Sequence, residues 1–181
     1  IDSANLMNKV FEVIEAHKIF NFSKKKYKIM IHPQSYVHSI INFKNGLTKI
    51  LLYGPDMKIP ISNILHKTEK NFSNFLKIDS KLLNNLNFYD VNKKKYPSVN
   101  LISKCNNSGP SSSIIVNASN EALVDLFLRG KIAFLDIVRT INKIFRDREF
   151  KKYARRRPKS VKDVEMIDKW ARLKTINMCV R

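Results

Sequence analysis

The stretch SIIVNASNEALVDLFLR, residues 113–129, decides how the second half of the chain folds, because its length and composition predict one long helix. Three more helices are expected on either side of it, at residues 98–105, 134–145 and 161–178. Four residues typical of helix ends separate these segments: Gly109, Pro110, Gly130 and Pro158. Short connections favour antiparallel neighbours, so we expect a helical bundle over residues 97–181.

The residues before the bundle predict a different architecture. Ser3 is expected to cap a helix that runs to about Phe20. Short β segments follow over residues 27–53, and Asn45-Gly46 between two of them favours a tight hairpin turn. Pro60 is expected to open a short helix. Residues 1–66 should therefore form one unit with a small, mostly antiparallel sheet, and the fold class is α+β.

Residues 67–96 are rich in Asn and Lys and show only weak periodicity, which favours a surface linker between the two units. The chain has 181 residues, of which 44% are hydrophobic. This proportion is typical of a folded globular protein and argues against a disordered, highly charged chain. No apolar run approaches the roughly 18 residues of a membrane span. We expect a soluble protein of the cytoplasm without a membrane partner.

Glycine is scarce, and this limits the functions that the chain can have alone. Its four glycines are isolated, so neither GxGxxG nor a P-loop can be written anywhere. A backbone cradle for a dinucleotide is therefore not expected in these residues. The sequence begins at Ile1 and not at Met, and we expect it to be a fragment of a longer protein.

The net charge of +19 raises the possibility of a nucleic-acid partner. The densest basic segment runs from Lys151 to Arg157 and includes Tyr153, an aromatic ring that could stack on a base. Compositional drift toward Lys, Asn and Ile explains the same charge without any partner. We favour that explanation and expect no nucleic acid, and a basic nucleic-acid-binding module is the alternative function.

One wedge of the first predicted helix gathers Asn8, Lys9 and Glu12. A carboxylate is a hard oxygen ligand of the kind that Mg²⁺ or Mn²⁺ prefers, and a lysine beside it can neutralise a phosphate. The wedge could therefore hold a divalent cation next to a phosphate group, with the Ser3 hydroxyl as a further donor. A solvated helix face with an i,i+3 pair between Lys9 and Glu12 explains the same spacing.

Several blocks carry a family resemblance by their order and spacing: IDSA at 1–4, MNK at 7–9, EVIEA at 12–16, IHPQS at 31–35, PDM at 55–57, NASNEA at 117–122 and WAR at 170–172. Together they resemble the C-terminal half of 1-deoxy-D-xylulose 5-phosphate reductoisomerases. These are NADPH- and metal-dependent oxidoreductases of the non-mevalonate isoprenoid pathway, which form 2-C-methyl-D-erythritol 4-phosphate. The resemblance implies that residues 1–66 end an α/β catalytic domain and that the full-length protein is a homodimer.

The resemblance also implies roles for single residues. Ser3, Asn8 and Lys9 would hold the phosphate of the sugar-phosphate substrate. Glu12 would also contact the substrate, as a catalytic residue and one of three carboxylate ligands to Mg²⁺ or Mn²⁺. His38 and Met57 match residues near the family's site.

The remaining parts of such a site would lie upstream of this sequence. They are the other two metal carboxylates and the residues that bind NADPH, so the isolated chain is expected to be inactive. Where the family has small residues after its lysine, this sequence has Val10-Phe11, which would enlarge the side chains beside the site.

Overall fold

The computed structural model describes residues 1–65 and 80–179, and it divides into two compact units. Unit 1 comprises Ile1–Lys28 and Asn92–Arg181, and unit 2 comprises Ile29–Val91. This division differs from the expected domains at 1–66 and 97–181, because the first helix packs with the C-terminal helices. The first thirteen residues of the predicted linker, 67–79, and the adjacent His66 lie outside the described residues.

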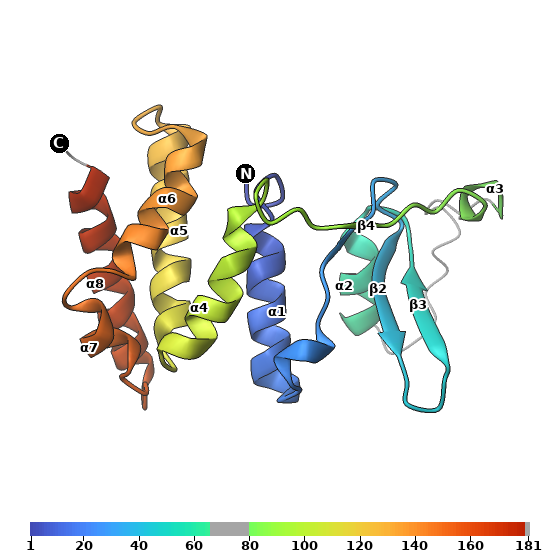
Figure 1. Cartoon of the computed structure of the whole chain (residues 1–181), viewed down its shortest axis with the longest axis horizontal. Helices are drawn as coiled ribbons and strands as arrows, with labels where there is room; N and C mark the ends of the chain where they lie inside the picture. Colours follow the sequence, from blue (N-terminus) through green and yellow to red (C-terminus); the bar gives the residue numbers. More distant parts are fainter. Residues whose placement is uncertain (66–79, 180–181) are drawn as a thin grey trace. The chain divides into compact units, whose positions relative to one another are not determined.

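Unit 1 is helical. Its longer helices are α1 (Met7–Phe20), α4 (Asn100–Ser108), α5 (Ser112–Leu128), α6 (Phe134–Ile144) and α8 (Val161–Cys179). Shorter segments join them: η1 (Lys24–Lys26), η2 (Pro97–Val99) and α7 (Phe150–Ala154). Figure 1 shows α4 lying beside both α1 and α5, while α6 and α8 pack on α5.

Two apolar clusters form the core of unit 1, and α5 contributes to both. One cluster contains Met7, Val10, Ile14, Leu101, Cys105, Val116, Leu123, Ile137 and Ile141. The other contains Ile115, Ala118, Ile144, Phe150, Ala154, Ile167 and Ala171. Each large aliphatic side chain buried in this way contributes about 1.5–3 kcal/mol. Val10 and Phe11, which replace the family's small residues after the lysine, pack in the first of these clusters. Val10 is fully buried, and Phe11 packs against the cluster.

Unit 2 contains two small antiparallel sheets. Strands β2 (Val37–Asn42) and β3 (Thr48–Leu52) form a hairpin in which Ile40 lies opposite Ile50. The predicted turn is confirmed, because Gly46 takes a left-handed φ of 86° and Asn45 Oδ1 accepts the Leu47 N–H at 3.1 Å. The second sheet pairs β1 (Met30–Ile31) with β4 (Tyr89–Asp90).

The pairing of β4 with β1 shows that the linker prediction is wrong for residues 89–90, which return to the sheet. Unit 2 also contains two short helices, α2 (Lys58–Leu65) and α3 (Ser80–Leu83). Helix α2 begins before Pro60, because the Asp56 carboxylate accepts the Lys58 N–H at 2.9 Å and starts the helix two residues earlier.

The predicted helices of the bundle are confirmed with small shifts of their ends, and the α+β class holds. The first starts at Pro97 as η2 and continues as α4 to Ser108. The sequence did not predict α7, which has only five residues. Within residues 1–65 and 80–179, no helix combines the length and the apolar character that a membrane crossing needs.

The connection between α4 and α5 predicts a strict requirement for glycine. Gly109 has φ 138° and ψ 169°, and a Cβ there would lie 2.4 Å from the carbonyl oxygen of Ala154. Gly109→Ala should lower the free energy of unfolding by about 3 kcal/mol or more. Gly130→Ala is the matched control: its φ is 68°, a Cβ meets no atom within 4 Å, and the cost should be about 1–2 kcal/mol. Equal effects in chemical denaturation would contradict this packing.

Candidate functional site at the start of α1

The segment that leads into α1 is a compact turn. Residues 2–6, here called the N-terminal turn, end at Leu6 with a left-handed φ of 60°, so the helix begins only at Met7. Asn5 Oδ1 accepts the Met7 N–H at 2.9 Å, whereas Ser3 is exposed. The prediction that Ser3 caps the helix is therefore wrong, because the backbone leaves the helical region after Ser3 and the Asn5 amide takes the capping role.

Three predicted site residues lie in the first two turns of α1. Lys9 Nζ is 2.8 Å from both carboxylate oxygens of Glu12, and their side chains are 42% and 55% exposed. Asn8 is half-buried, and its Oδ1 is buried without a hydrogen-bond donor among the described residues. The i,i+3 pair expected for a solvated helix face is thus present. Its two charged groups are also accessible to a ligand, next to an acceptor that has no partner.

The N-terminal turn is attached to the bundle at two points. Asn120 Nδ2, on α5, donates to both carboxylate oxygens of Asp2 at 3.1 Å. The Ser98 hydroxyl, in η2, donates to the carbonyl oxygen of Asn5. Ser3 lies between these two anchored residues. Nothing in the sequence pointed to a contact between Asn120 and Asp2, which is 118 residues away.

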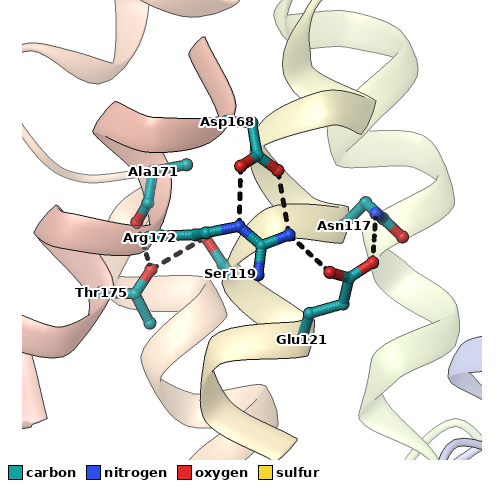
Figure 2. A network of polar contacts seen from close by, with 7 residues as sticks. All are labelled: Asn117, Ser119, Glu121, Asp168, Ala171, Arg172 and Thr175. Carbon is teal, nitrogen blue, oxygen red and sulfur yellow. Dashed lines mark hydrogen bonds and ion pairs between the residues drawn. The ribbon is translucent and has the colours of Figure 1, made fainter. Parts of the chain in front are cut away.

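On the side of α5 that faces α8, four side chains form a polar network that we call the α5–α8 clasp (Figure 2). Arg172 donates through Nε to Asp168 at 2.7 Å and through Nη2 to Glu121 at 2.5 Å. Asn117 Nδ2 donates to the other Glu121 oxygen at 3.0 Å. Hydrogen bonds to Asp168 and Glu121 raise the pKa of the Arg172 guanidinium, so it stays charged.

Comparison with known proteins identifies the family. The model of the DXP reductoisomerase C-terminal domain matches residues 52–174. The 1-deoxy-D-xylulose 5-phosphate reductoisomerase of Pelagibacter ubique is 40% identical over 181 residues, which are 99% of this chain and 46% of that protein. The chain belongs to the DXP reductoisomerase family. The Crocosphaera subtropica reductoisomerase is 38% identical over 95% of this chain and 42% of its own length.

Solved reductoisomerase structures share the fold. The Zymomonas mobilis enzyme in complex with NADPH has a TM-score of 0.87 and 31% identity, covering 99% of this chain and 46% of that one. A DOX-P reductoisomerase in complex with NADPH, fosmidomycin and magnesium has a TM-score of 0.90 and 28% identity, covering 98% and 45%. The chain thus spans about half the length of the DXP reductoisomerases that it matches.

The two remaining predicted site residues belong to unit 2. His38, on β2, stacks on Tyr53 with ring centroids 3.6 Å apart, and its Nε2 lies 3.2 Å from the Tyr53 carbonyl oxygen. Met57 is exposed just before α2. Throughout the described part of the chain, no three His, Cys, Asp or Glu side chains gather where they could hold a metal ion. Glu12 is therefore a single potential ligand.

The basic segment from Lys151 to Arg157 packs in part against the bundle, whereas the nucleic-acid alternative requires an accessible aromatic ring beside the cations. Residues 150–154 form α7, in which Phe150 and Ala154 are buried. Tyr153 stacks on Trp170 with centroids 4.2 Å apart, so its ring is engaged within the bundle. Nothing found in the comparisons supports a nucleic-acid partner.

The α5–α8 clasp predicts that Arg172 cannot be replaced by lysine without loss. Arg172→Lys keeps the charge but removes the fork that reaches Asp168 and Glu121 together, and should cost about 1 kcal/mol of unfolding free energy. Arg129→Lys is the control: among the described residues Arg129 pairs with Asp125, and it is 68% exposed, so the cost should be near zero. Thermal unfolding of both variants tests this, and equal shifts would contradict a role for the clasp.

Proposed function

We propose that the full-length protein containing this chain converts 1-deoxy-D-xylulose 5-phosphate into 2-C-methyl-D-erythritol 4-phosphate with NADPH and Mg²⁺ or Mn²⁺. This chain would supply part of the substrate and metal site. The observation that carries the proposal is the exposed Lys9–Glu12 pair beside Asn8 at the start of α1, in a chain of the reductoisomerase family.

The phosphate end of the substrate would bind at Ser3, Asn8 and Lys9. Together they offer an ammonium group, amide N–H groups and a hydroxyl, which are the donors that a phosphate accepts from most strongly. Ser3 is exposed, and Lys9 keeps 42% of its side chain exposed, so both can reach a ligand.

The divalent metal would bind at Glu12. Mg²⁺ is commonly held by one or two carboxylates together with oxygen atoms of the substrate and water, so a single exposed carboxylate suits a shared site. The other protein ligands would come from residues outside this chain. When bound, such a metal polarises the substrate's oxygen atoms as a Lewis acid.

The ion pair between Lys9 and Glu12 has to open when both ligands bind. Each group would exchange its partner for one of higher charge, since Lys9 would turn to the phosphate and Glu12 to the metal. An exposed pair of this kind is worth about 0–1 kcal/mol, so opening it costs little. In the free protein the pair neutralises the two charges and holds them together, and we expect the two ligands to bind close to these positions.

NADPH would be bound by residues outside this chain, because the sequence contains no glycine-rich phosphate-binding motif. The isolated chain should then show no turnover.

We also propose a cytoplasmic location, since Cys105 and Cys179 are both unpaired, as is usual in a reducing compartment. Burial raises the pKa of the Cys105 thiol to about 12, so it stays neutral.

Replacing Glu12 tests the proposed metal role. Glu12→Gln in the full-length protein should lower kcat by about a thousandfold or more, because the neutral amide cannot replace a charged ligand. Glu15→Gln is the matched control, an exposed glutamate one turn further along α1, and should leave turnover unchanged. NADPH oxidation in the presence of Mg²⁺ is the measurement. Full turnover of Glu12→Gln in an active parent protein would refute the assigned role.

We further propose that the full-length protein is a homodimer that associates through the β2–β3 hairpin. Ile40 and Ile50 face each other across the hairpin and stay 40% and 44% exposed, with Phe43 and Leu47 also exposed. Within residues 1–65 and 80–179, each of these strands pairs on one edge only, and an open edge with exposed apolar side chains favours pairing with another surface.

Sedimentation velocity tests this proposal. Ile40→Lys should convert the dimer to a monomer, because the buried charge would have no partner. Leu135→Lys is the matched control: Leu135 is 61% exposed on α6 of unit 1, and its replacement should leave the dimer intact. A monomeric parent protein, or an Ile40→Lys variant that is still dimeric, would contradict the proposed interface.

A further inference from the structure

Asn120 is a buried amide on α5. It is 1% exposed, and its Nδ2 donates to both oxygens of the Asp2 carboxylate at 3.1 Å. Its Oδ1 is buried without a donor among the described residues. The orientation of the amide is fixed by its partner, because a carboxylate accepts hydrogen bonds and would repel Oδ1. Burying a half-satisfied amide is unfavourable for stability alone, which points to a role in holding Asp2.

Asp2 in turn holds the N-terminal turn against the first turn of α1. Its carbonyl oxygen accepts the Asn8 N–H at 3.4 Å, so one residue connects α5 with the residue that precedes Lys9. On the far side of Ser3, Asn5 is buried and caps the helix through its Oδ1. Ser3 thus projects from a short segment that is fixed on both sides, although it is itself exposed.

We propose that Asn120 is a positioning residue for the phosphate subsite: through Asp2 it fixes the backbone on which Ser3 and Asn8 are presented to the substrate. This inference rests on the proposed function, because it assumes that these residues hold a phosphate. Hydrogen bonds to a phosphate depend steeply on distance and angle, so a shift of about 1 Å in the turn weakens substrate binding strongly.

The α5–α8 clasp supports this role from the other side of the same helical turn. Glu121, the next residue, is bound to Arg172, and Asn117 donates to Glu121 (Figure 2). The turn of α5 that carries Asn120 is therefore fixed against α8. A rigid support is what a positioning residue requires.

The test compares single and reciprocal variants in the full-length protein. Asn120→Asp places two carboxylates together and should raise the KM for 1-deoxy-D-xylulose 5-phosphate about tenfold or more, with little change in the KM for NADPH. Combining it with Asp2→Asn restores an amide–carboxylate pair with the donor reversed, and should return the KM to within about threefold of the parent value. Asn177→Asp, at an exposed position on α8, is the matched control and should leave both KM values unchanged.

Asp2→Ala removes the same contact without placing a carboxylate at the buried position 120. Asp2 itself is only half-buried, so its replacement by alanine leaves no large cavity. It should raise the substrate KM to a similar extent as Asn120→Ala, and the double alanine variant should be no worse than either single one. Melting temperatures of all variants separate a shifted turn from general unfolding.

Two results would overturn the inference alone: an unchanged substrate KM in Asp2→Ala, or no recovery in the reciprocal double variant. A loss confined to kcat or to NADPH binding would also overturn it. If the parent protein itself does not turn over the substrate, the proposed function fails and this inference fails with it.

Discussion

Burial of α5 between two apolar clusters is the constraint on which unit 1 depends. Val116 and Leu123 enter one cluster, and Ile115 and Ala118 enter the other, so the helix is covered on two sides and keeps only a narrow exposed stripe at residues 117, 121 and 125. Small side chains at its contact with α8 let the two backbones approach. There, the buried Thr175 hydroxyl donates to the Ala171 carbonyl oxygen at 2.6 Å and accepts from the Ser119 hydroxyl at 3.0 Å (Figure 2). Because so many neighbours pack on α5, its position fixes that of every group bonded to it.

The candidate site inherits its geometry from this helix. The residues proposed to hold the phosphate lie in and beside the N-terminal turn, yet the turn is anchored by Asn120 of α5 and Ser98 of η2. Helix α1 contributes Met7, Val10 and Ile14 to the same core. In this family member the helical C-terminal region thus packs against the N-terminal turn that would carry the phosphate subsite. A change in the packing of the bundle should therefore change the affinity for the substrate.

Local patterns predicted much of this molecule. Helix periodicity located the bundle helices, and Asn45-Gly46 located the hairpin. The short sequence blocks shared with the reductoisomerases identified the family. Long-range partners were not predictable, since neither the pairing of β4 with β1 nor the bond from Asn120 to Asp2 leaves a periodic signal. The start of α1 was misplaced because Ser3 and Asn5 are both good capping residues, and only the left-handed Leu6 decides between them.

A crystal structure of the full-length protein with 1-deoxy-D-xylulose 5-phosphate and Mg²⁺ tests the central claim most directly. The substrate's phosphate should lie within hydrogen-bonding distance of Ser3, Asn8 and Lys9. The Glu12 carboxylate should have left Lys9 for the metal, and the bond between Asn120 and Asp2 should be intact. A phosphate bound elsewhere, with Lys9 and Glu12 still paired at the 2.8 Å of the free chain, would contradict it.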